Sequence, residues 1–282
     1  MKRPIIFTYN ITWPYTLSLV IAVLMTGLSL AGIFFQNSLY PSEALRRSFV
    51  SNDVVNLLIG LPVLLGSLWL ARRGKLIGPL CWPGALFYST YNYIAYAAAM
   101  PLTFHFVFYL ALAVLSIFTL VGLLSGLDAV SIGERLRGQV PERLAGGVLA
   151  EFGALFFLHS AGQIFVVIFN QAAPSAPELG KLMADLLTCP VWVLGGVLLW
   201  CRQAFGYVSG AGLLFQVSML FIGLLAFFYL AALPERSTLR FGRFYGDFGH
   251  GAGLFHPLWA VCAWHINARI GTLKNVASGL IN

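Results

Sequence analysis

The stretch YTLSLVIAVLMTGLSLAGIFF, residues 15–35, contains twenty-one residues and no charged side chain. A helix needs about 20 apolar residues to cross a bilayer core of about 30 Å, and it satisfies its own backbone hydrogen bonds, which lipid cannot do. The stretch therefore predicts a membrane-spanning helix. Lys2 and Arg3 precede it, as in a signal peptide, but the apolar run is too long and no small-residue cleavage site follows. We favour an uncleaved first helix.

The composition of the whole chain also indicates a membrane protein. Hydrophobic residues make up 59% of the 282 residues, charged residues 10%, and the mean hydropathy is +0.83. Soluble proteins carry about 25% charged residues, so this chain has too few to cover a water-facing surface. The net charge of +7 lies mainly in short links between apolar runs. That pattern fits orientation in a bilayer better than nucleic-acid binding, so the expected partner is the lipid bilayer.

Seven segments have the length and composition of membrane spans, which predicts an all-α integral membrane protein. Residues 1–233 form the predicted polytopic bundle, and 234–282 form a separate polar and aromatic tail. The predicted spans are Tyr15–Phe35, Val54–Ala71, Leu76–Tyr96, Phe104–Leu124, Val148–Ile168, Leu182–Cys201 and Val208–Ala232.

The distribution of lysine and arginine predicts the orientation, since cytoplasmic loops are enriched in both. With the N-terminus inside, nine basic residues of 1–233 lie on the inner side and three on the outer side. We therefore predict a cytoplasmic N-terminus in the cell membrane. The inner residues are Lys2, Arg3, Arg72, Arg73, Lys75, Arg135, Arg137, Arg143 and Arg202, and the outer ones are Arg46, Arg47 and Lys181.

The longest inner link, Gly126–Gly147, carries charges of both signs. We favour a solvated connector. The alternative is a short interfacial helix that ends before Pro141, since proline cannot continue a helix.

A weak internal similarity relates the second and sixth predicted spans. Asp53, Pro62 and Leu68-Trp69 in one correspond to Asp185, Pro190 and Leu199-Trp200 in the other. Both segments run in the same direction, so a true repeat would be a parallel arrangement of four helices plus four, as in some transporters. The alternative is that such residues recur at helix ends for ordinary reasons. A true repeat predicts an eighth helix, which this chain lacks.

The tail, residues 234–282, does not supply that helix. Its best apolar stretch, Leu254–Ile266, is too short to span. A frameshift would account for the change of character, since the codons of Tyr245-Gly246, in the shifted frame, encode Met or Thr, and those of Asp247-Phe248 encode Ile or Thr. The alternative is a genuine polar tail with an amphipathic patch.

Several motifs resemble a family of uncharacterised bacterial multi-pass membrane proteins. The resemblance covers roughly Ser51–Leu233. It implies a topology, with a last apolar helix that this chain lacks, and no activity. The motifs are Asn52–Pro62, Trp82-Pro83-Gly84, Tyr91-Asn92-Tyr93, Leu199-Trp200 and Gly206-Tyr207.

Polar residues inside the predicted spans are the candidate site, because such groups are costly in a membrane. They would line an outward-facing polar cavity for a cation, a proton or a small solute. The predicted cavity residues are Asp53, Asn56, Asn92, His159, Gln163 and Asp185.

Structural interpretations compete with this cavity, and we favour them. Asp53 and Asp185 are interpreted as N-terminal caps. His159 and Gln163, four residues apart, are interpreted as hydrogen-bonding between helices. The tyrosines from Tyr88 to Tyr96 are interpreted as an interfacial aromatic belt rather than a binding cage.

The sequence contains no catalytic motif such as H-E-x-x-H or G-x-S-x-G, and its four cysteines are scattered without metal-ligand spacing. We expect no metal and no cofactor. The favoured function is that of an accessory or structural membrane protein. The first alternative is transporter-like handling of a solute or ion, and the second is a membrane-embedded enzyme acting on a lipid.

Overall fold

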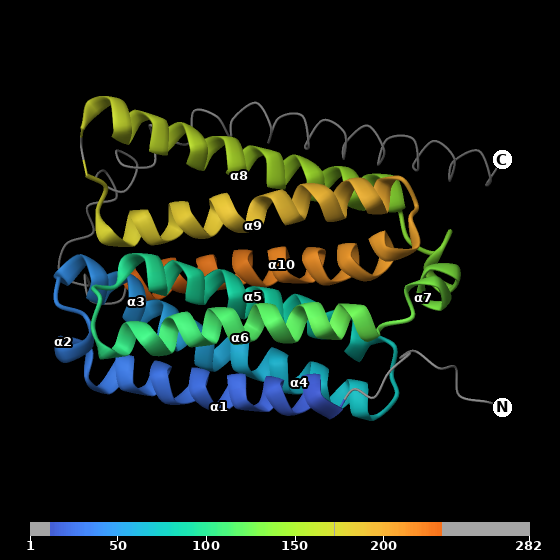
Figure 1. The fold of residues 1–282 in the computed structure, drawn as a ribbon, viewed down its shortest axis with the longest axis horizontal. Helices are drawn as coiled ribbons and strands as arrows, with labels where there is room; N and C mark the ends of the chain where they lie inside the picture. The colour runs from blue at the N-terminus through green and yellow to red at the C-terminus, as the bar shows by residue number, and fades with distance from the viewer. Residues whose placement is uncertain (1–11, 172, 233–282) are drawn as a thin grey trace, which may run out of the picture. The chain divides into compact units, whose positions relative to one another are not determined.

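The computed structural model describes residues 12–171 and 173–232, which contain helices and no strand (Figure 1). By internal contacts the chain divides into residues 1–231 and 232–282. The predicted tail and its proposed frameshift lie outside the described residues. The elements are α1 Thr12–Phe34, α2 Gln36–Leu39, α3 Glu43–Val55, the π-helical turn η1 Asn56–Gly60, α4 Leu61–Arg72, α5 Ile77–Ala99, α6 Phe104–Gly126, α7 Ala129–Leu136, α8 Glu142–Asn170, α9 Ala176–Trp200 and α10 Ala204–Ala232.

Six helical segments of the described residues are long and apolar enough to cross a membrane, which fits a membrane protein. They are α1, the continuous segment Glu43–Arg72, α6, α8, α9 and α10. The remaining predicted span corresponds to α5, which has 23 residues but is too polar to meet the same hydropathy criterion. The reason is its content of tyrosine, asparagine and proline, so the seventh span stays a prediction.

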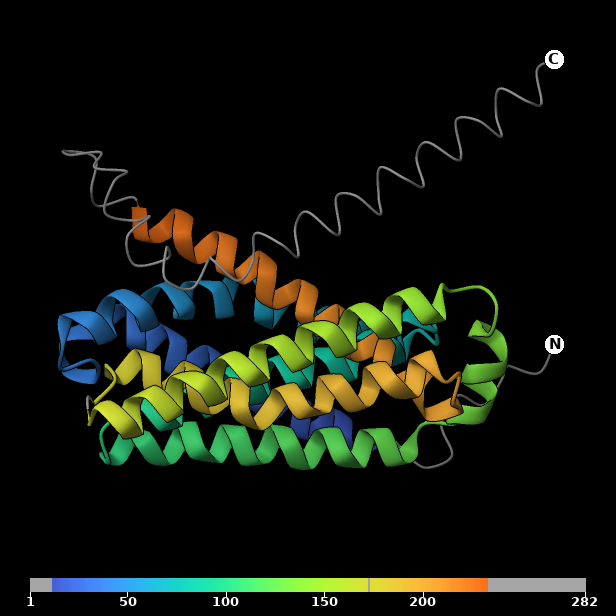
Figure 2. The same cartoon turned by 90° about the horizontal axis from the view of Figure 1, so that it is seen from above.

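The polar helix α5 lies among the apolar ones. It contacts α4, α6 and α9, and the two views of the fold agree on this (Figure 1 and Figure 2). Fifteen of its 23 residues are buried. The aromatic and polar side chains of α5 therefore face other helices and not the surroundings of the protein.

The link Gly126–Gly147 contains the short helix α7, as the alternative interpretation predicted, and its position at a membrane interface stays a prediction. Asp128 caps α7 by accepting a hydrogen bond from the backbone N–H of Ser131. The hydroxyl of Ser131 donates to the same carboxylate, and these bonds hold the pKa of Asp128 below its usual value. The chain then turns at Gly138 in the left-handed conformation, and α8 begins directly after Pro141.

Glycines let neighbouring helices approach at backbone distance. A Cβ atom added at Gly146 of α8 would lie 2.5 Å from the carbonyl oxygen of Gly196 in α9. In the same way, a Cβ at Gly180 of α9 would lie 2.5 Å from the carbonyl oxygen of Ala95 in α5. Small residues at helix contacts are typical of membrane bundles, where packing replaces the hydrophobic effect between helices.

Replacement of Gly146 by alanine should therefore destabilise the protein by about 1–3 kcal/mol, the usual range for overpacking. Gly162→Ala on the same helix is the control, because nothing lies within 4 Å of a Cβ added there. That variant should be neutral or slightly stabilising, since alanine favours helix over glycine. Thermal unfolding of the purified protein in detergent measures both, and equal midpoints would contradict the close approach of α8 and α9.

Candidate functional site

The carboxylate of Asp53 lies inside the protein with neutral partners. The residue sits within α3 and is 2% exposed. Its Oδ2 accepts a hydrogen bond from the hydroxyl of Tyr40 at 2.5 Å, and its Oδ1 accepts one from Tyr96 at 2.7 Å. Among the described residues, no lysine, arginine or histidine forms an ion pair with Asp53. An ionised Asp53 would thus be a buried charge without a counter-charge.

The interpretation of Asp53 and Asp185 as helix caps is wrong. The cap of α3 is Ser42, whose side chain accepts from the backbone N–H of Leu45, and α9 begins with a capping box of Ser175 and Glu178. Both helices extend by polar first turns beyond the point where their apolar residues start. The two carboxylates consequently lie well inside their helices, where no free backbone N–H groups remain to be capped.

Three further hydroxyl groups belong to the cluster around Asp53. The hydroxyl of Ser29 lies beside the carboxylate, that of Tyr93 beside Ser29, and that of Tyr109 beside Tyr40. These residues are 1%, 1% and 2% exposed. Within the described part of the chain, none of the three hydroxyls makes a hydrogen bond of good distance and angle. Buried hydroxyls usually find a partner, so this group of free oxygens needs an explanation.

Aromatic rings close the surroundings of Asp53. The ring of Tyr96 lies 4.5 Å from that of Phe49 and 5.0 Å from that of Tyr109, between centroids. Tyr88, Tyr93 and Tyr96 are all buried in the protein interior. An interfacial aromatic belt is therefore wrong for these three tyrosines, which line the interior instead.

The predicted residues Asn56 and Asn92 lie in the same region, joined through α5. Asn56 is fully buried and accepts a hydrogen bond from the Tyr88 hydroxyl at 3.1 Å, while its Nδ2 has no partner among the described residues. Asn92 donates to the carbonyl oxygen of Tyr88 and accepts from Asn52, each at 3.0 Å. Asn52 also belongs to this group of polar residues, and the sequence analysis did not predict it.

The backbone around Asn56 is irregular. Asn56–Gly60 forms a π-helical turn ahead of Pro62, which lacks the N–H that a regular helix needs there. Such turns inside α-helices occur frequently at functional sites.

A second buried carboxylate, that of Asp185 in α9, contacts side chains of α5 and α8. It is 3% exposed and accepts hydrogen bonds from Tyr91 at 2.8 Å and Ser160 at 3.1 Å. Lys181 and His159 are close enough to interact with it electrostatically. Gln163, by contrast, is exposed on α8. The structure thus places His159 beside Asp185 and leaves Gln163 away from both carboxylates.

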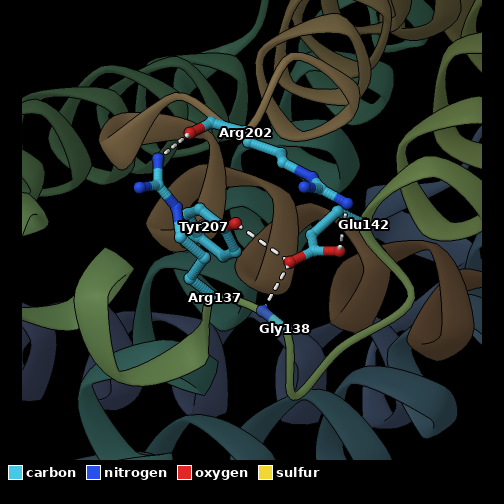
Figure 3. A network of polar contacts seen from close by, with 5 residues as sticks. All are labelled: Arg137, Gly138, Glu142, Arg202 and Tyr207. Atoms are coloured by element: carbon cyan, nitrogen blue, oxygen red, sulfur yellow. Dashed lines mark hydrogen bonds and ion pairs between the residues drawn. The ribbon is translucent and has the colours of Figure 1, made fainter.

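A polar network that the sequence analysis did not anticipate joins α8 to the turn between α9 and α10 (Figure 3). The buried Glu142 accepts hydrogen bonds from the backbone N–H of Gly138 at 2.7 Å and from Tyr207 at 3.1 Å. Arg202 lies 3.8 Å from the same carboxylate. Arg137 donates to the carbonyl oxygen of Arg202 at 3.4 Å. The group holds three segments together.

Gln216 is another buried polar residue that the sequence analysis passed over. It lies in α10 and accepts a hydrogen bond from the indole N–H of Trp192 at 2.8 Å. Within an apolar helix a single glutamine gives no signal by itself. Its pairing with a tryptophan of another helix becomes evident only in the structure.

In comparisons with known proteins, no family model, no curated protein and no solved structure matches this chain. The class of protein therefore follows from the fold and the site alone. Its described residues form an all-helical bundle with six helices long and apolar enough to cross a membrane, and two buried carboxylates receive hydrogen bonds from tyrosines of α5. Within the described residues, no three histidine, cysteine or acidic side chains come together as metal ligands do.

Loss of the Glu142 carboxylate should weaken the join between α8 and the α9–α10 turn. Glu142→Ala leaves the buried Tyr207 hydroxyl without an acceptor, which costs about 1–3 kcal/mol. The N–H of the exposed Gly138 also loses its acceptor, but water can replace it. Glu134→Ala in α7 is the control, because Glu134 is exposed. Limited proteolysis and thermal unfolding should show a looser Glu142→Ala variant and an unchanged control. Identical behaviour of both variants would show that the network adds nothing to stability.

Proposed function

We propose that this protein handles a small cation or protons, in the manner of a transporter, through the polar cluster that α3, α5 and α9 bury. The observation that carries the proposal is Asp53, a buried carboxylate with two phenol donors and no cationic partner among the described residues. Ionisable groups inside membrane-spanning segments are rare, and they mark ion pathways and proton relays.

The energetics favour a functional acid over a structural one. A buried charge is expensive unless it is paired, and well-packed apolar residues stabilise a fold as well as a buried ion pair or better. In an accessory protein, Asp53 and Asp185 would only cap or pack helices, and Ser42 and Ser175 occupy the cap positions. Binding and release of a positive charge by the carboxylate of Asp53 explains why an acidic residue is buried there.

For the topology, we propose seven spans with α5 as the central one. Its polar side chains face α4, α6 and α9, so the helix can lie at bilayer depth although it is the least apolar. The excess of lysine and arginine supports a cytoplasmic N-terminus in a bacterial cell membrane. Asp53 and Asp185 would then lie toward the outer side.

A parallel repeat is part of the same proposal. Asp53 and Asp185, the corresponding acids of the two similar segments, each accept a hydrogen bond from a tyrosine of α5, Tyr96 in one case and Tyr91 in the other. The two segments would then present equivalent carboxylates to one central helix. The prediction that this chain lacks the eighth helix of such a repeat falls on residues outside the described part.

Ion flux tests the proposal. The purified full chain, reconstituted in liposomes of phosphatidylethanolamine and phosphatidylglycerol, should dissipate an imposed gradient of Na⁺ or of protons faster than protein-free liposomes. Fluorescent Na⁺ and pH indicators inside the liposomes report the two ions. Asp53→Asn should reduce the rate to that of protein-free liposomes, because the amide cannot carry the charge.

Glu134→Gln, a matched loss of one exposed carboxylate, is the control and should keep the rate of the unchanged protein. Flux in Asp53→Asn equal to that of the control would exclude Asp53 from the pathway. The absence of flux of both ions would exclude ion transport as the function.

A further inference from the structure

We propose that Asp53, Ser29, Tyr93 and Tyr109 form a binding site for Na⁺ between α1, α3, α5 and α6. The inference rests on the proposed function for the role of Asp53, and it adds the identity of the ion and the groups that hold it. All of these residues are at most 2% exposed.

Unused oxygen atoms are the first argument. The hydroxyl of Ser29 lies beside the Asp53 carboxylate, that of Tyr93 beside Ser29, and that of Tyr109 beside Tyr40, and none of the three makes a hydrogen bond of good geometry in the described part of the chain. Each has lone pairs free to coordinate a cation. Hard cations take oxygen ligands from carboxylates and other neutral oxygen groups, and this site offers such oxygens only.

The charge of the cluster selects a monovalent cation. Asp53 is the acid of the cluster, and the other titratable groups that face it are the phenols of Tyr40, Tyr93, Tyr96 and Tyr109. Burial raises the pKa of Tyr40 well above its usual range, so its hydroxyl keeps the proton that it donates to Asp53. The cluster therefore carries at most one negative charge, which one Na⁺ neutralises.

The tight packing selects a small ion. Gly32 of α1 lies directly against the carboxylate, and a Cβ atom added there would overlap with Oδ2 of Asp53 and lie 2.5 Å from the Tyr40 hydroxyl. The ring centroids of Tyr93 and Tyr96 are 5.6 Å apart, and those of Tyr96 and Tyr109 are 5.0 Å apart. Such close surroundings favour Na⁺ over the larger K⁺ and over organic cations.

Asp185 provides an internal contrast. It is as buried as Asp53 and also accepts two hydroxyl donors, but Lys181 lies close enough to interact with it electrostatically. No cationic residue acts on Asp53 in this way, so Asp185 depends less on a bound cation. Asp185→Asn is therefore the matched control for Asp53→Asn.

Thermal unfolding of the purified full chain in detergent tests the site at equilibrium. NaCl is titrated against choline chloride at constant ionic strength, and a parallel series uses KCl. A ligand that binds the folded state raises its stability in a saturable way. We expect a saturable rise of the midpoint with Na⁺, a much weaker one with K⁺, no rise in Asp53→Asn and an unchanged rise in Asp185→Asn.

Milder variants keep the test decisive if Asp53→Asn fails to fold. Tyr93→Phe and Tyr109→Phe each remove one hydroxyl that makes no hydrogen bond of good geometry and keep the ring, so they should fold. Each should raise the half-saturating Na⁺ concentration by about tenfold, which corresponds to about 1.4 kcal/mol. Gly32→Ala should weaken Na⁺ binding, and Gly27→Ala on the same helix should not, because nothing lies within 4 Å of a Cβ there.

The outcomes separate this inference from the proposed function. Equal stabilisation by Na⁺, K⁺ and choline, or a half-saturating Na⁺ concentration that is unchanged in Tyr93→Phe and Tyr109→Phe, overturns the Na⁺ site. Flux that depends on Asp53 without any Na⁺ response also overturns it, because the carboxylate then carries a proton, but it leaves the proposed function intact. Specific Na⁺ binding without flux upholds the site and overturns transport.

Discussion

The polar side chains of α5 impose the constraint on which the rest of the described structure depends. Tyrosine hydroxyls and an asparagine amide that are buried among apolar helices need hydrogen-bond partners within the protein. The helix therefore lies among α4, α6 and α9, and the acids of α3 and α9 supply acceptors for its hydroxyls. The hydroxyl donors of α5 and the buried carboxylate acceptors of its neighbours thus satisfy one another.

Close approach of the helices makes these hydrogen bonds reachable. Glycines bring α9 to the backbone of α5 at Gly180 and to that of α8 at Gly196, and Gly32 brings α1 against the carboxylate of Asp53. Tyr96 and Asp53 lie on different helices, yet their oxygens are 2.7 Å apart. Side chains of ordinary size at those glycines would separate the helices and leave the same polar groups unpaired, which costs more than the lost packing alone.

The sequence predicted those parts of the fold that depend on length and composition. Apolar runs locate the helices, because a span needs about 20 apolar residues, and six of the seven predicted segments correspond to helices that could cross a membrane. The prediction of the helix starts was wrong where polar turns extend a helix, as after Ser42 and Ser175. For this reason two acids that lie inside their helices were interpreted as caps. The tyrosines were misinterpreted because sequence periodicity does not distinguish burial against protein from burial at an interface. Asn52 and Gln216 were missed for the same reason, since their partners lie on other helices.

The difference between the two buried acids lies in the charges around them and not in their burial or their hydrogen bonds. Asp185 has Lys181 within electrostatic range, whereas Asp53 has phenols and a serine hydroxyl. The lysine offsets part of the charge of Asp185, so a change of ion concentration has less effect there. At Asp53 a charge from outside the protein has to compensate the carboxylate, and the stability of the protein then follows the concentration of that ion.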